Sequence, residues 1–111
     1  MKTFNEYQRW TKTTAKYPGQ FSGDLIYPAL GLAGEVGECI EHVKKTIRDD
    51  GGKLSDERRD KLLLELGDAQ YYLARLADEA GLTLEEVIRA NVDKLEDRKA
   101  RGKIHGSGDT R

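Results

Sequence analysis

The chain has 111 residues, of which 35% are charged and 37% are hydrophobic. This length and composition indicate one globular domain and exclude both a second hydrophobic core and an intrinsically disordered chain. The formal net charge of −1 argues against binding to a nucleic acid polymer, because such proteins normally carry a basic excess over a whole face.

The chain has one cysteine, Cys39, so no internal disulfide is possible. It has no charged and apolar leader, and it has no apolar run of about 18 residues that could cross a membrane. We therefore expect a cytoplasmic protein that has no membrane partner.

Helical spacing of apolar residues predicts four helices and almost no strand. The first helix begins after Thr3, which is followed by Glu6 as in a capping box, and it ends before Pro18. Residues 17–24 hold one proline and two glycines and are predicted to form a loop. The second helix runs from about residue 27 to residue 48.

The third and fourth helices have clear capping signals at their ends. The third begins after Ser55, a typical N-cap residue, and ends near Ala80. Gly81 is a typical C-terminal cap. Thr83 and Glu86 form a second capping box, which predicts the start of the fourth helix.

These elements predict a helical domain over residues 1–101 and a Gly- and Ser-containing tail over residues 102–111. The predicted fold is an all-α antiparallel bundle of about four helices. In the third helix, Leu62 to Leu64 wrap most of the circumference and Tyr71 lies away from the main apolar stripe. One small bundle cannot bury both sides of such a helix, so we expect a homodimer or a homotetramer.

The second and third helices carry nearly the same motif at an offset of 30 residues, Glu35-Val36-Gly37-Glu38 and Glu65-Leu66-Gly67-Asp68. At about 100° per residue, the two carboxylates of each helix lie on one flank of its apolar stripe. The stripes consist of Leu32, Val36, Ile40, Val43 and Ile47 in the second helix and of Leu62, Leu66, Leu73 and Ala77 in the third. Two antiparallel helices packed through these stripes would bring four carboxylates together.

Pairs of acidic residues at this spacing are common on solvated helix faces, so neither pair alone indicates a site. The glycines are less expected, because Gly37 and Gly67 each cost about 1 kcal/mol relative to alanine within a helix. With Gly31 and Gly34, they predict the close approach of another helix or of a ligand. Four facing carboxylates would also repel one another unless a divalent cation lay among them. All-oxygen ligands favour Mg²⁺ or Mn²⁺ over zinc.

The fourth helix carries Asn91, Lys94 and Arg98 on one side. These residue types bind phosphate, although they could equally pair with solvent or with acidic neighbours. Residues 94–111 have a net charge of +3, which leaves −4 on residues 1–93. A basic end beside an acidic body would suit a small polyanion.

The paired acidic motif, with 26 residues between Glu38 and Glu65, resembles the E-x-x-E…E-x-x-D signature of the MazG-like all-α nucleotide pyrophosphohydrolases. The resemblance covers roughly residues 3–101. It implies that Mg²⁺ is bound by the four acidic residues, Glu35, Glu38, Glu65 and Asp68.

The segment Asn91-x-x-Lys94-Leu95-x-x-Arg98 is similar to the downstream helix of that family. The resemblance implies that Lys94, Arg98 and Asn91 hold the triphosphate. It also implies cleavage of nucleoside triphosphates between the α and β phosphates, which releases the monophosphate and pyrophosphate and often removes non-standard nucleotides.

The residues fit this chemistry independently of the resemblance. Hydrolysis of a phosphoanhydride needs neutralised phosphate charge and an activated water, and divalent ions supply both. One carboxylate would accept the proton, and Glu38 and Glu65 are the candidate catalytic bases. The chain has no P-loop motif and no Ser or Cys nucleophile constellation, so direct attack by water is preferred to a covalent intermediate.

Two other functions stay open at this stage. A related enzyme of the same architecture would act on dUTP or on phosphoribosyl-ATP and would differ only in its base pocket. A non-catalytic helical module would bind a protein partner and leave its acidic faces solvated. A carboxylate di-iron bundle fits less well, because such proteins use Glu-x-x-His pairs and here Glu38 and His42 are four residues apart.

Overall fold

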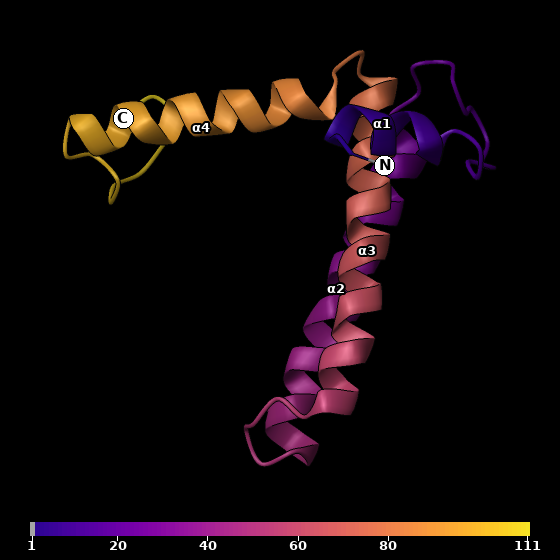
Figure 1. The fold of residues 1–111 in the computed structure, drawn as a ribbon, viewed down its shortest axis with the longest axis vertical. Coiled ribbons are helices and arrows are strands. Elements are labelled where there is room, and N and C mark those ends of the chain that lie inside the picture. The colour runs from indigo at the N-terminus through magenta and orange to yellow at the C-terminus, as the bar shows by residue number, and fades with distance from the viewer. Residues whose placement is uncertain (1) are drawn as a thin grey trace.

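The computed structural model describes residues 2–111, and these form four α-helices and no strand (Figure 1). The helices are α1 (Phe4–Thr11), α2 (Ile26–Asp49), α3 (Asp56–Glu79) and α4 (Leu84–Ala100). The predicted all-α class is confirmed. Among the described residues, no helix combines the length and apolarity needed to cross a membrane.

The predicted helix boundaries are confirmed at most ends by their caps. The side chains of Thr3, Ser55 and Thr83 each accept a hydrogen bond from the backbone N–H three residues later. Thr83 and Glu86 form the complete capping box. Gly81 has a φ of 76°, the left-handed conformation that a glycine C-cap provides.

The first helix is shorter than its sequence pattern predicts. The hydroxyls of Thr11, Thr13 and Thr14 each donate to the backbone carbonyl three residues earlier. Such side-chain hydrogen bonds compete with the helical ladder, and three of them within four residues end the helix early. The segment that follows is therefore free to leave the axis of α1 and cross towards α2.

α2 and α3 lie antiparallel and form the long arm in Figure 1. α1 packs at the end of this arm where α3 finishes, and α4 leads away from the same end. α4 contacts α1 and α3 but not α2. Its first turn is held by two backbone N–H groups, those of Leu84 and Glu85, which donate to the side chains of Gln8 and Asn5. Most of α4 therefore projects into solvent in the single chain.

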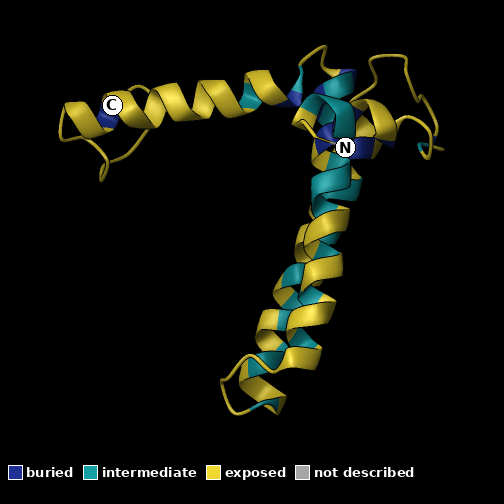
Figure 2. Cartoon of the chain, in the orientation of Figure 1, coloured by how far each residue is buried: buried dark blue, intermediate teal, exposed yellow. Residues whose placement is uncertain are grey.

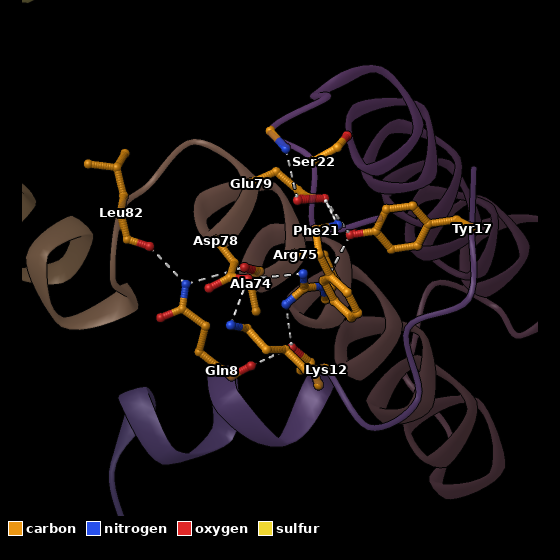
Figure 3. A network of polar contacts seen from close by, with 12 residues as sticks. Gln8, Lys12, Tyr17, Phe21, Ser22, Ala74, Arg75, Asp78, Glu79 and Leu82 are labelled. Atoms are coloured by element: carbon orange, nitrogen blue, oxygen red, sulfur yellow. Dashed lines mark hydrogen bonds and ion pairs between the residues drawn. The ribbon is translucent and has the colours of Figure 1, made fainter. Parts of the chain in front are cut away.

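A network of buried polar side chains fixes the α1–α2 loop against the end of α3 (Figure 3). Arg75 is fully buried and donates to the Tyr17 hydroxyl at 3.2 Å and to the Asp78 carboxylate at 3.0 Å. Glu79 is also buried and accepts from the Tyr17 hydroxyl at 3.1 Å and from the Phe21 N–H at 2.9 Å. Buried charges persist only when they are paired and hydrogen-bonded, as these are. The sequence patterns left this loop without any predicted structure.

The α2–α3 contact uses only part of the predicted apolar stripes, because Leu32 and Leu62 are half-buried and Ala77 is buried but the other stripe residues are exposed. On α2 the half-buried positions include Glu35, Cys39 and His42, whereas Val36 and Ile40 are exposed. The expectation of stripe-to-stripe packing within one chain is therefore wrong for most of the length of the two stripes. The physical reason is that an apolar stripe requires a partner but does not specify which one, and here a polar flank of each helix faces its neighbour in the hairpin.

Few apolar side chains are buried in the single chain, and most of the cartoon in Figure 2 has the colour of exposed residues. The buried hydrophobic cluster consists of Ala74, Ala77 and Leu84. The solvent-accessible surface is 7902 Å² and the radius of gyration is 16.8 Å. A compact monomer of this size exposes about 6,200 Å² and has a radius of gyration of about 13 Å. Much apolar surface is thus left without a packing partner.

Candidate functional site

Three acidic side chains meet where α2 and α3 pack. Glu35 comes from α2, and Glu65 and Asp68 come from adjacent turns of α3. One carboxylate oxygen of each residue lies within 4.8 Å of the others. Glu35 and Glu65 are half-buried, whereas Asp68 is exposed. The antiparallel pairing of the two helices thus gathers three of the four residues that the sequence singles out as metal ligands.

The group carries negative charge that the chain itself does not neutralise. Burial raises the pKa of the Glu35 carboxyl, and three nearby carboxylates raise this pKa further, in the order Asp68, Glu65 and Glu38. Within residues 2–111, no lysine or arginine forms an ion pair with the group, and Glu65 has only His42 at 3.8 Å. Three oxygen donors with uncompensated charge fit a hard divalent cation such as Mg²⁺.

Glu38 lies outside this group. It is exposed and follows Glu35 by three residues on α2. By helix geometry it lies about 60° further round α2 from the face that packs on α3 than Glu35 does. It remains close enough to raise the pKa of Glu35.

Two consecutive polar contacts connect Glu65 to His42 and His42 to Arg58. His42 Nε2 lies 3.8 Å from Glu65 Oε1, and Arg58 Nη1 lies 3.3 Å from His42 Nδ1. Arginine can only donate, so Nδ1 accepts and the proton of a neutral His42 sits on Nε2, on the side of Glu65. Arg58 also donates to Asp50 at 3.1 Å. Sequence reasoning missed Arg58, because an arginine in the first turn of a helix gives no signal of its own.

A cavity of 370 Å³ opens beside the carboxylates. Glu35 and Asp68 line one part of it. The remaining lining residues come from the end of α1, the α1–α2 loop and α3, and they are Thr14, Lys16, Tyr17, Tyr71 and Tyr72. The rings of Tyr71 and Tyr72 meet edge to face with their centroids 5.3 Å apart, and the ring of Tyr17 stacks on that of Tyr27. Sequence reasoning did not find Lys16, because loop residues have no periodic pattern.

The residues expected on the fourth helix do not reach the carboxylates of their own chain. Asn91 is exposed on the projecting part of α4. Lys94 Nζ lies 3.2 Å from an Asp109 carboxylate oxygen. Arg98 is buried by the tail, where it donates to the backbone carbonyls of Asp109 at 2.8 Å and Gly108 at 3.3 Å. In this structure the two cations therefore bind the C-terminal tail.

The helical glycines differ in what surrounds them. A Cβ built on Gly37, Gly67 or Gly34 meets nothing within 4 Å. The expectation of close packing at these positions is wrong within the single chain, because their faces point away from the α2–α3 contact. Gly31 is the exception, since its Cβ would come within 2.6 Å of the Tyr72 ring.

Comparison with known proteins identifies a family that matches most of the chain. Residues 28–102 match the MazG nucleotide pyrophosphohydrolase domain, a span that holds all the gathered carboxylates. The chain is also similar to the Gene 37 protein of Mycobacterium phage L5, with 45% identity over 109 residues that cover 95% of this chain and 96% of that protein. That name states no activity. No solved structure matches the chain.

Proposed function

The chain belongs to the MazG nucleotide pyrophosphohydrolase family, and we propose that it is a Mg²⁺-dependent nucleoside triphosphate pyrophosphohydrolase. It cleaves between the α and β phosphates to give a nucleoside monophosphate and pyrophosphate, with non-standard nucleotides as the proposed substrates. The observation that carries this proposal is the uncompensated group of Glu35, Glu65 and Asp68 beside a cavity.

Glu35, Glu65 and Asp68 would hold Mg²⁺, and Mn²⁺ suits the same oxygen donors. A bound divalent ion supplies charge for a phosphoryl oxygen and lowers the pKa of a water molecule. Glu38, exposed at the edge of the group, is then available as the catalytic base that accepts a proton from the attacking water. Glu65 is the alternative base, and His42 would hold its carboxylate in place in either role.

We also propose that the protein works as a homo-oligomer, a homodimer or a homotetramer. The surface exceeds that of a compact monomer by about 1,700 Å², and a stable interface takes about 800 Å² from each partner. The outward stripe of α2 offers such an interface, with Val36, Ile40, Val43 and Ile47 all exposed. A second copy of the chain offers the same apolar stripes in return.

In such an oligomer, Lys94, Arg98 and Asn91 of one copy would reach the carboxylates of another copy. α4 leads away from the end of the α2–α3 arm and does not contact α2, so these residues lie on a helix that extends away from the carboxylates of the same chain. We propose that they bind the triphosphate held by the carboxylates of a second copy. In that arrangement a phosphate would replace the Asp109 carboxylate on Lys94.

A nucleotide panel tests the function. Wild-type protein is incubated with common and non-standard triphosphates, including dUTP, and with phosphoribosyl-ATP, with Mg²⁺ or with EDTA, and the products are separated. We expect monophosphate and pyrophosphate, with none in EDTA, and the preferred nucleotide decides between a broad enzyme and one for dUTP or phosphoribosyl-ATP.

Two variants and a control complete this test. Glu35→Gln and Asp68→Asn should lose turnover while keeping their helical circular dichroism. The control is Glu41→Gln, which changes a carboxylate of α2 that pairs with Lys44 and lies outside the acidic group. This variant should keep wild-type turnover. If wild-type protein cleaves no nucleotide and Mg²⁺ does not raise its melting temperature, the protein is a non-catalytic helical module.

A further inference from the structure

The cavity beside the carboxylates has one cationic side chain in its lining, that of Lys16. Lys16 is exposed and, within residues 2–111, it forms no ion pair. We propose that Lys16 binds a phosphate group of the nucleotide in this cavity. The inference rests on the proposed function and adds to it a residue from outside the acidic motif and outside α4.

The backbone on both sides of Lys16 is anchored. On one side, the Thr14 hydroxyl hydrogen-bonds to the Tyr71 hydroxyl at 3.1 Å, and Thr14 N–H donates to the Thr11 carbonyl. On the other side, Tyr17 is buried and its hydroxyl contacts both Arg75 and Glu79. A long flexible side chain thus starts from a fixed point at the edge of the cavity, which lowers the cost of ordering it on a ligand.

The ion pairs around the cavity leave the Lys16 ammonium group available to an anionic ligand. Lys12, in the preceding turn of the chain, is paired with Asp78 at 3.7 Å, whereas Lys16 is not paired with Glu35 or Asp68 although all three line one cavity. Lys16 therefore does not serve to neutralise the carboxylates. A divalent ion would offset two of the three negative charges of Glu35, Glu65 and Asp68, and Lys16 is then the one cationic side chain of the cavity lining that a phosphate oxygen can contact.

The cavity suits a phosphate chain in size and in chemistry. Its 370 Å³ lies within the range of about 300–1,000 Å³ that is usual for small-molecule sites. The carboxylates come from α2 and α3, and Lys16 comes from the α1–α2 loop. Negative and positive side chains therefore line the cavity from different elements of the fold. A phosphate chain that is held by metal ions at one end would present its remaining oxygens to a compact ammonium group such as that of Lys16.

Inorganic tripolyphosphate with Mn²⁺ is the probe for this inference, because it carries the phosphates without any base. Calorimetric titration compares wild type, Lys16→Ala, Lys16→Arg and Lys53→Ala. Lys53 is a matched control, since it is an exposed lysine in the α2–α3 turn and outside the cavity lining. Titration with Mn²⁺ alone and a thermal melt are run for each protein.

We expect Lys16→Ala to weaken tripolyphosphate binding by about tenfold, the effect of one charge-assisted hydrogen bond. Lys16→Arg should stay within about threefold of wild type. Binding of Mn²⁺ alone and the melting temperature should not fall, and Lys53→Ala should match wild type. The inference is overturned if Lys16→Ala binds tripolyphosphate as wild type does, if it loses Mn²⁺ affinity to the same extent, or if Lys53→Ala shows an equal loss. Failure of the proposed function is distinct, because then wild type itself does not bind Mn²⁺ and tripolyphosphate together, and the inference falls with it.

Discussion

Gly31 of α2 lies directly under the ring of Tyr72 of α3. A Cβ on Gly31 would come within 2.6 Å of two ring carbons, closer than real side chains approach. Gly31 lies one turn before Glu35, and Tyr72 lines the cavity together with Glu35. The missing side chain at Gly31 therefore lets an aromatic ring of α3 rest on the backbone of α2 beside the carboxylates.

Gly31→Ala is expected to displace the Tyr72 ring. Overpacking at such a contact costs about 1–3 kcal/mol in the free energy of unfolding. Gly34→Ala is the control, since its Cβ meets nothing within 4 Å and alanine should stabilise the helix by up to about 1 kcal/mol. Urea unfolding of both variants measures the difference. Equal stability of the two would show that the ring yields without cost.

The acidic group predicts a pH dependence that Mg²⁺ should cancel. The pKa of Glu35 is raised by burial first and then by Asp68, Glu65 and Glu38. Between its ordinary pKa and this raised pKa the folded state holds more protons than the unfolded state, so the free energy of unfolding falls as pH rises through that window. Thermal melts without metal should show this fall, and Glu35→Gln should flatten it.

Metal binding should show the opposite trend with pH. Because the carboxylate must lose its proton to bind Mg²⁺, affinity should rise as pH rises through the same window, and binding should release protons. Melts at saturating Mg²⁺ should therefore lose the fall that metal-free protein shows. A metal affinity that is independent of pH across this window would argue that Glu35 is not a ligand.

The parts of the fold that local chemistry decides could be predicted from the sequence. The side chains of the N-cap residues Thr3, Ser55 and Thr83 each accept a hydrogen bond from the N–H three residues later. The start of each of these helices can therefore be predicted from one short segment of sequence. The acidic motif is recognisable for the same reason, because Glu65 and Asp68 share a helix face at fixed spacing.

The parts that depend on which faces meet could not be predicted. The sequence predicts Val36 and Ile40 inside the α2–α3 contact, but both are exposed. Helical periodicity shows which face of α2 is apolar, but it does not show which helix covers that face. The direction of α4 is set by Gln8 and Asn5, residues some 80 positions away that bind its first two N–H groups. The position of Lys16 depends on the α1–α2 loop, which buried Arg75 fixes through its hydrogen bond to the Tyr17 hydroxyl. No local sequence pattern predicts this long-range contact.

Removal of Arg75 should release the loop that carries Lys16. Arg75→Leu leaves the Asp78 carboxylate and the Tyr17 hydroxyl without their buried donor, and breaking such a pair costs about 3–5 kcal/mol. Arg48→Leu is the matched control, since Arg48 pairs with Asp49 on an exposed surface and should change the melting temperature little. Thermal melts compare the two, and a small loss for Arg75→Leu would mean that the network is not what fixes the loop.

The proposed use of α4 by a second copy predicts complementation between inactive variants. Asp68→Asn removes a carboxylate and should be inactive alone. Lys94→Ala removes a cation of α4 and should keep only a small turnover at triphosphate concentrations well below its raised KM, which are the concentrations used for this test. If one site takes these groups from different chains, half of the dimers in an equal mixture are mixed, and each mixed dimer has one intact site. Such a mixture, unfolded and refolded together, should regain about a quarter of wild-type turnover. No recovery from folded mixed dimers would place both groups on one chain.

The C-terminal tail is expected to compete with the substrate for α4. The Asp109 carboxylate lies 3.2 Å from Lys94 Nζ and 3.5 Å from Arg98 Nη2. Contact with Lys94 first, and with Arg98 second, lowers the pKa of Asp109, so its charge does not titrate near neutral pH. A phosphate that binds the same cations must displace this carboxylate.

Asp109→Asn should therefore lower KM for the triphosphate by about two- to fivefold, the range for loss of an exposed ion pair, and leave kcat unchanged. Asp93→Asn on α4 is the control for net charge, because Asp93 forms no ion pair within residues 2–111. In a Lys94→Ala background the effect of Asp109→Asn should shrink, since the competitor has then lost its nearest cation. Steady-state kinetics of wild type, Asp109→Asn, Asp93→Asn, Lys94→Ala and the Lys94→Ala/Asp109→Asn double variant decide the matter. A rise in KM for Asp109→Asn would mean that the tail supports substrate binding, and equal effects in both backgrounds would mean that it acts without Lys94.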